Sequence, residues 1–301
     1  MAYVVVIQVR VEEWWMEKSA ILSALAAEVE QGRLIFPTSA NTAIRTRRML
    51  EDPDCGIETV TKLIQADPLL STKVVAVANS SVFNRSGKRI TDVKSAITLI
   101  GFRTVRNLAT VIVVQQLSGR HAKSEKVTQL WRHSAHVAAL AQVIARRITH
   151  QDPDTALFAG MIHEISWFYL LAREDSYPGL VDDDVASSWS SDEDLEDGGE
   201  LDCEIKIGTA ILNALSVPQP VIEGIVCMWE GYLAFPPTTL GDTLLFADQL
   251  APVKSPFILP SHQTGDDIKA QIDIMTDKST LSEILQDSAA EVKSLTDALC
   301  G

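Results

Sequence analysis

Apolar residues recur at helical spacing along most of the chain, and proline and glycine divide this pattern into segments of helix length. Pro68 fits the first position of a helix, and Asp92 is suited to cap one that ends at Gly101, with a further helix from Phe102. Only residues 3–11 show an alternation of apolar and polar residues, a weak one, which suggests a short strand. The pattern therefore predicts an all-α fold. The expected helices are 13–31, 39–51, 57–64, 68–79, 92–101, 102–117, 127–148, 153–168, 205–215, 218–229, 237–250 and 280–299.

Composition places the chain among globular proteins. It has 301 residues, of which 46% are hydrophobic and 22% charged, enough for a sizeable core. Its apolar runs are shorter than the roughly 18 residues of a membrane span, and its N-terminus shows no secretory signal. The four cysteines lie far apart without a Cys-x-x-Cys pair, as is typical of reduced thiols. We therefore expect a cytoplasmic protein without a membrane interaction.

Charge is distributed unevenly along the sequence. Residues 174–204 hold 13 acidic and no basic residues, whereas residues 33–120 hold 13 basic and 6 acidic residues, a net charge of +7. The acidic stretch is typical of a solvated loop, and a partner-binding insert is the alternative. The basic region can attract an anionic partner.

Four arginines in the basic region are candidates for binding an anion or an acidic partner: Arg45, Arg48, Arg103 and Arg106. A solvated surface is the simpler interpretation of the same residues. Nucleic-acid binding is not expected, because the basic residues are not interleaved with aromatic ones.

Two histidines and two carboxylates form a candidate metal site. His133 lies on one expected helix, His163 is followed directly by Glu164 on another, and Asp248 lies on a third. Imidazole and carboxylate ligands suit iron, manganese or zinc, and water bound to such a metal can attack a phosphate ester. Histidines that simply form hydrogen bonds in the core are the alternative.

A series of short motifs, in a fixed order, resembles the HDOD domain, the HD-related output domain of bacterial signalling proteins. The similarity covers roughly residues 34–252. The motifs are Asp67-Pro68, Ala78-Asn79-Ser80, Ser95-Ala96-Ile97, Leu99-Ile100-Gly101, Arg106-Asn107-Leu108, Leu130-Trp131-Arg132-His133-Ser134 and Ala159-Gly160-Met161-Ile162-His163-Glu164.

The resemblance implies a two-lobed helical bundle whose C-terminal lobe is related to HD-type phosphohydrolases. It divides the chain into an N-terminal extension (1–32), an N-terminal helical lobe (33–120), an HD-like lobe with the acidic loop 174–204 (121–260) and a C-terminal helix (261–301). That last helix has leucines in near-heptad steps after a capping-box pattern at 280–283. It is expected either to pack on its own chain or to form a homodimer.

Catalytic HD proteins hold metal with a His, a His-Asp pair and a distal Asp. By motif, these positions fall on His133, on His163 with Glu164, and on Asp248. The pair here is His-Glu rather than His-Asp, and Ser166-Trp167 follows it in place of Gly-Lys.

Further departures lie where two-metal relatives have additional histidines. Met228-Trp229 and Glu204 occupy those positions, and a thioether or an indole is a poor ligand for a hard cation. The site is therefore expected to be vestigial, with no cofactor, and a single divalent metal is the alternative.

The function expected from these features is non-catalytic. The chain would act in signalling by binding a partner protein or a small ligand, through a change in the arrangement of its lobes. The alternative is a metal-dependent phosphohydrolase or phosphodiesterase that acts on nucleotides at the degenerate HD site.

Overall fold

The computed structural model describes residues 20–33, 41–52, 54–117, 124–178, 180–181, 199–231, 234, 237–257 and 278–300. Over these residues the secondary structure is helical and contains no strand, so the predicted all-α fold is confirmed. The strand expected at 3–11 lies outside the described part of the chain. A helix over residues 20–30 buries Leu22, Leu25 and Val29 in the core.

In its described residues, the first lobe contains four helices. Asp67 caps one of them, because its Oδ1 accepts hydrogen bonds from the backbone N–H groups of Leu69 and Leu70, and Pro68 holds the first helical position as predicted. The four helices are α2 (Asn41–Met49), α3 (Ile57–Gln65), α4 (Pro68–Ala78) and α5 (Val93–Leu117).

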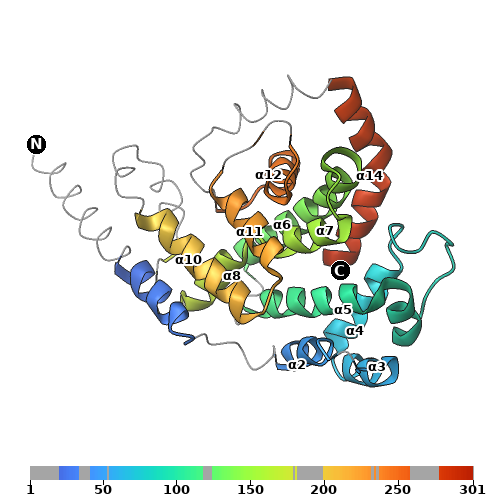
Figure 1. Cartoon of the computed structure of the whole chain (residues 1–301), viewed down its shortest axis with the longest axis horizontal. Coiled ribbons are helices and arrows are strands. Elements are labelled where there is room, and N and C mark those ends of the chain that lie inside the picture. Colours follow the sequence, from blue (N-terminus) through green and yellow to red (C-terminus); the bar gives the residue numbers. More distant parts are fainter. Residues whose placement is uncertain are drawn as a thin grey trace, which may run out of the picture.

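Helix α5 bends sharply at Gly101, which has φ 78° and ψ 163°. Two predictions are confirmed here: the helix breaks at this glycine, and Asp92 Oδ1 accepts a hydrogen bond from Ser95 N at 2.8 Å at its start. A backbone with these angles is accessible mainly to glycine. Helix α5 crosses the middle of the molecule and packs on α2, α3 and α4 as well as on helices of the second lobe (Figure 1).

The second lobe is built around one long central helix. It comprises α6 (Glu125–Ile144), the π-helical turn η3 (Ala145–Thr149), α7 (Pro153–Ile162), α8 (Ile165–Arg173), α10 (Gly199–Ala214), α11 (Gln219–Trp229) and α12 (Leu240–Leu250). Helix α6 packs closely against α7, since a Cβ atom placed on Gly160 would lie 2.6 Å from Ala138 Cα. It also packs against α12.

Two boundaries in this lobe differ from the prediction. The single helix expected over 153–168 is two helices, α7 and α8, separated at His163 and Glu164. Helix α10 begins at Gly199, inside the acidic stretch 174–204 that was expected to be a loop. Residues 182–198 of that stretch lie outside the described residues.

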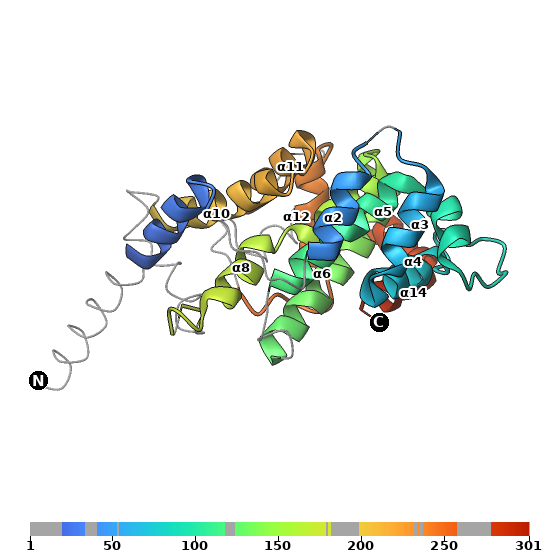
Figure 2. The same cartoon turned by 90° about the horizontal axis from the view of Figure 1, so that it is seen from below.

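The C-terminal helix α14 (Lys278–Cys300) lies along α6 and reaches α4 in the other lobe (Figures 1 and 2). Its apolar seam faces its own chain, because Leu295 and Leu299 are each 1% exposed. The helix begins before the capping box expected at 280–283. The apolar side of α14 therefore packs on its own chain, which is one of the two expected arrangements. A homodimer through this helix stays a prediction, which a measurement of the oligomeric state would test.

Both lobes hold the end of α14 at one atom. Lys73 Nζ of α4 and Trp131 Nε1 of α6 donate hydrogen bonds to the carbonyl oxygen of Leu299, at 2.6 and 3.1 Å. Lys73 is 2% exposed, so an ammonium group is buried at the contact between the lobes. Burial lowers the pKa of Lys73 from its usual value, more than the nearby Cys300 raises it.

Two described helical stretches are long and apolar enough to cross a membrane, Val93–Leu117 and Pro153–Arg173. Their most apolar windows are 61% and 89% buried inside the molecule, as expected for core helices. The expectation that the protein does not interact with membranes stays a prediction.

Candidate metal centre

The four candidate metal ligands come from three separate stretches of the sequence and meet at one point in the second lobe. His133 projects from α6, Asp248 from α12, and His163 and Glu164 lie at the junction of α7 and α8. His133 Nε2 lies 3.1 Å from Asp248 Oδ1 and 3.3 Å from His163 Nε2. One nitrogen from each histidine and one Asp248 oxygen all lie within 4.8 Å of one another.

Backbone carbonyls fix the orientation of both imidazole rings. His133 Nδ1 lies 2.9 Å from the carbonyl oxygen of Val253, and His163 Nδ1 lies 2.7 Å from that of Gly160. Because a carbonyl can only accept, each Nδ1 carries the proton and donates it. The two Nε2 atoms therefore face the cluster, which is the usual arrangement of a metal-binding histidine.

Glu164 reaches the same point despite its extra methylene. Its Oε1 lies 3.4 Å from His133 Nε2 and 3.7 Å from His163 Nε2. The sequence predicted that Glu164 lies on a helix. It lies instead at the junction of α7 and α8, with φ −90° and ψ 21°. The carbonyl of the preceding His163 accepts a hydrogen bond from Trp229 Nε1 at 3.0 Å, which satisfies the backbone where the helix stops.

Burial shifts the pKa values of the adjacent His163 and Glu164 in opposite directions. Burial, followed by the charge of His133, lowers the pKa of His163 to about 4, so this ring is neutral at pH 7. Burial also raises the pKa of Glu164 to about 7, against the opposing influence of His133.

His133 and Asp248 stabilise each other's charged form. Burial alone would lower the pKa of His133, but the hydrogen bond to Asp248 and the charges of Glu164 and Asp248 outweigh it and raise the pKa. Burial likewise opposes ionisation of Asp248, and its contacts with His133 lower the pKa overall. In the absence of a metal, the contact between His133 and Asp248 thus favours the charged form of each.

These donors fit one divalent cation. Two neutral imidazole nitrogens 3.3 Å apart in a buried place repel each other unless a proton or a cation lies between them. With Asp248 and Glu164, they form a nitrogen and oxygen donor set that suits iron, manganese or zinc. A metal held by these residues would lower the pKa of a bound water and polarise a phosphate oxygen.

Apolar packing fills the position where a second metal would need further histidines. Met228 and Trp229 are 8% and 4% exposed, and the Trp229 indole packs closely against Gly208, as does the Ser166 hydroxyl. Next to it, Trp167 stacks on Phe257 with ring centroids 4.2 Å apart. In the described residues the donor set is therefore that of a single cation. Trp131 and Trp167 are both core residues, 6% and 1% exposed.

The cluster is almost closed to solvent. His133 is 1% exposed, His163 2% and Glu164 6%, and only the Asp248 side chain, at 25%, has appreciable access. A phosphate ester in solution therefore has little direct access to the imidazole nitrogens.

The four candidate arginines do not form one group. Arg45 and Arg48 are exposed on α2, and Arg106 is half-buried on α5. Arg103 is paired with acidic residues, since its Nη2 lies 2.9 Å from Asp154 Oδ2 and 3.3 Å from Asp152 Oδ1.

Sequence reasoning missed Arg47, the arginine that joins the lobes. It is 6% exposed and donates hydrogen bonds to Glu51 and, at 3.0 Å, to the carbonyl oxygen of Ser216 after α10. Burial, partly offset by Glu51, lowers the pKa of Arg47. Its position four residues after the buried Ala43 places it on the core face of α2, and this spacing is the signal that could have revealed it.

Two helical lobes with a His, a His-acid pair and a distal Asp converging in the second lobe define an HD-related helical protein. A profile of the HDOD domain matches residues 36–230, and the chain belongs to the HDOD family. No curated protein matches the chain.

Solved structures share the fold at low sequence identity. A Shewanella amazonensis protein, named as a candidate metal-dependent phosphohydrolase, is 21% identical, with a TM-score of 0.68 over 94% of this chain and 99% of its own. An HDOD domain protein of unknown function from Geobacter sulfurreducens is 20% identical, with a TM-score of 0.59 over 92% and 97%. A candidate signal transduction protein from Marinobacter aquaeolei is 17% identical, with a TM-score of 0.57 over 88% and 60%.

Proposed function

We propose that this chain is a non-catalytic regulatory HDOD protein of the cytoplasm, which acts by binding a signalling protein or a small ligand. The observation that carries the proposal is the burial of the cluster of His133, His163, Glu164 and Asp248, which we call the HD cluster. Both of its imidazole rings are at most 2% exposed. Metal-dependent hydrolysis requires an open coordination position that a substrate can reach. A buried cluster is better suited to hold α6, α7 and α12 together.

Signal transmission would occur through the contact between the lobes. In this contact, Arg47 bonds the Ser216 carbonyl, and Lys73 and Trp131 share the Leu299 carbonyl. Each bond joins residues distant in sequence and has a defined geometry, so a ligand that favours another lobe arrangement would have to break them.

A single-metal phosphohydrolase is the second candidate function. It is favoured by the convergence of His133, His163 and Asp248 and by the names of the Shewanella amazonensis proteins that share the fold. In that case Asp248, the most accessible of the four residues, would lie at the substrate side.

Metal analysis of protein purified without chelators, followed by assays on nucleotides and cyclic dinucleotides, distinguishes the two functions. We expect no turnover, whether or not a metal is bound. His163→Ala is the test variant, and His136→Ala, on the same helix as His133 but outside the cluster, is its control. Turnover with stoichiometric metal that is lost in His163→Ala and kept in His136→Ala would overturn the proposal.

A further inference from the structure

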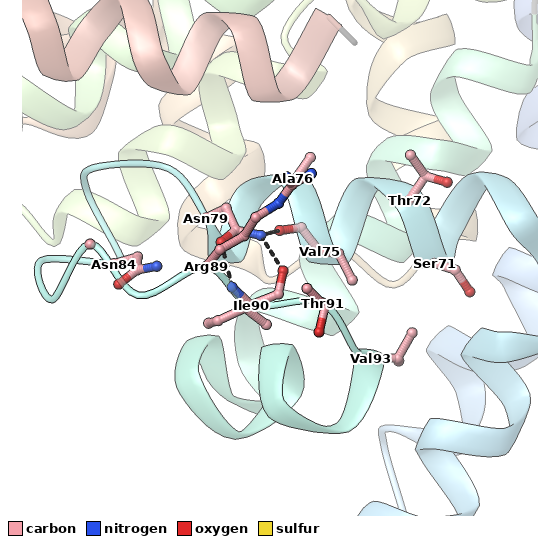
Figure 3. Close-up of a pocket in the computed structure, with 11 residues that line it drawn as sticks. Ser71, Thr72, Val75, Ala76, Asn79, Asn84, Arg89, Ile90, Thr91 and Val93 are labelled. Carbon is pink, nitrogen blue, oxygen red and sulfur yellow. Dashed lines mark hydrogen bonds between the residues drawn. The ribbon is translucent and has the colours of Figure 1, made fainter.

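A cavity of about 850 Å³ lies in the first lobe, between α4 and the chain that leads into α5 (Figure 3). Small side chains of α4, among them Ser71, Val75 and Ala76, line it on one side. Residues 89–91 and Val93 line it on the other. We call residues 88–91 the edge segment.

Two asparagine side chains hold the edge segment along one side. Asn79 Nδ2 donates to the carbonyl oxygen of Ile90 at 2.7 Å, and the N–H of Ile90 donates back to Asn79 Oδ1 at 2.8 Å. Asn84 Nδ2 donates to the carbonyl oxygen of Lys88 at 2.8 Å. These bonds involve every second residue, and this alternation is the pattern of an extended strand bonded along one edge.

Within the described part of the chain, the opposite edge of the segment has no backbone partner. Arg89 and Thr91, the residues whose backbone groups point the other way in an extended chain, are both exposed. Their N–H and C=O groups make no backbone hydrogen bond with the described residues. Such a row of free groups is a template on which another extended chain can pair.

Local hydrogen bonds fix the segment before any partner arrives. Ser86 Oγ donates to Asn84 Oδ1 at 2.8 Å, and Gly87 adopts a positive φ of 69° that turns the chain into the segment. Asn79 is itself anchored to α4, since its Nδ2 also donates to the Val75 carbonyl at 3.0 Å. A preformed edge reduces the entropy lost on binding.

The charge around the edge is positive. Arg85, Lys88 and Arg89 are exposed and form no ion pair with the described residues. The neighbouring Asp92 is committed to the start of α5, where its Oδ1 accepts the Ser95 N–H. An acidic chain would therefore be favoured over a neutral or basic one.

We propose that the edge segment binds an extended acidic segment of a partner protein by strand addition. Main-chain hydrogen bonds to Arg89 and Thr91 would supply affinity, and the three cationic side chains would select acidic sequences. The cavity beside α4 would receive one side chain of the added strand. This inference rests on the proposed binding function, because it identifies the kind of partner bound.

The test uses the full chain and a fluorescein-labelled nine-residue peptide of alternating glutamate and valine. Fluorescence anisotropy is expected to show saturable binding. The same peptide with N-methyl groups on two adjacent central residues, which blocks hydrogen bonding on both of its edges, is expected to bind at least 10-fold more weakly. Equal affinity of the two peptides, or no binding at millimolar peptide, would overturn strand addition.

Variants locate the binding to this edge. Arg89→Glu removes one cation, and Thr91→Pro removes one free N–H while leaving the Asn79–Ile90 pair, so each is expected to weaken binding about 10-fold. Arg147→Glu, at an exposed arginine of the other lobe, is the control with the same charge change. Equal weakening in this control would show non-specific attraction and overturn the assignment. If Thr91→Pro does not fold, Arg89→Glu alone tests the assignment, because it changes no backbone group.

Two further measurements separate this inference from its alternatives. The turnover assay and the peptide assay test different claims: absence of peptide binding in a chain that also lacks turnover would remove only the strand proposal and leave the proposed non-catalytic function standing. Sedimentation is expected to show no self-association through this edge. Self-association that Arg89→Glu abolishes would mean that a second copy, rather than a separate partner, occupies it.

Discussion

Lys73 shows how one residue in the contact between the lobes makes stability depend on pH. Burial lowers its pKa in the folded protein below the usual 10.5, so the folded state loses this proton before the unfolded state does. Where the unfolded chain binds more protons, stability rises with pH. The stability that the buried ammonium costs is therefore regained as pH rises towards 10.5.

Lys73→Met is expected to remove this pH dependence. The free energy of unfolding of the natural chain, relative to the variant, should increase between neutral pH and about pH 10.5, with a slope of at most about 1.4 kcal/mol per pH unit. Urea unfolding at several pH values measures it. Lys62→Met, at an exposed lysine of α3, is the control. Parallel curves for the natural chain and Lys73→Met would contradict the prediction.

Trp229→Phe is expected to destabilise the fold by about 1–3 kcal/mol, because the carbonyl of His163 loses its donor in a buried place. The free energy of unfolding in urea measures the effect. An unchanged unfolding midpoint would show that the indole hydrogen bond does not hold the junction of α7 and α8.

The sequence indicated the four candidate ligands more readily than the residues that support them. His133, His163, Glu164 and Asp248 could be proposed because each belongs to a motif with a known place in the HD fold. Trp229 could not, because its partner, the carbonyl of His163, is 66 residues away and backbone acceptors leave no trace in a sequence. The spacing from Ala43 could place Arg47 on the core face of α2, but it could not pair Arg47 with the Ser216 carbonyl, 169 residues away.

At the scale of the element, the predictions succeeded where the signal is local. Asp92 and Gly101 mark the start and the bend of α5 by their own chemistry, and both were read correctly. The break between α7 and α8 has no proline or glycine at His163 and Glu164, and long-range contacts stabilise it. The apolar spacing continues through it, so periodicity alone predicted one helix.

Gly101→Ala is expected to cost about 1–3 kcal/mol of stability, because φ 78° with ψ 163° is strained for alanine. No atom would lie within 4 Å of the added Cβ, so the cost comes from the backbone alone. Gly56→Ala provides the matched control, since that glycine also has open space but an ordinary φ of −80°. Thermal unfolding compares the two, and equal melting temperatures would contradict the prediction.

At the scale of the whole molecule, the two lobes are joined by α5, by α14 and by a few buried polar bonds. Arg47→Ala is expected to destabilise the protein by about 1–3 kcal/mol, because it leaves the Ser216 carbonyl without its charged donor. Arg48→Ala, at the exposed neighbouring position, should change stability by less than about 0.5 kcal/mol. Chemical denaturation of both variants measures the difference, and similar losses in the two would show that Arg47 does not join the lobes.

The bond from the Trp229 indole to the His163 carbonyl has a practical consequence. The indole proton touches the backbone of a candidate ligand, yet the tryptophan itself offers no atom to a metal. Its NMR resonance is thus a native reporter, and titration with zinc or manganese should shift or broaden that signal selectively when an ion enters. Occupancy can be followed in this way without a label, a substrate or any turnover.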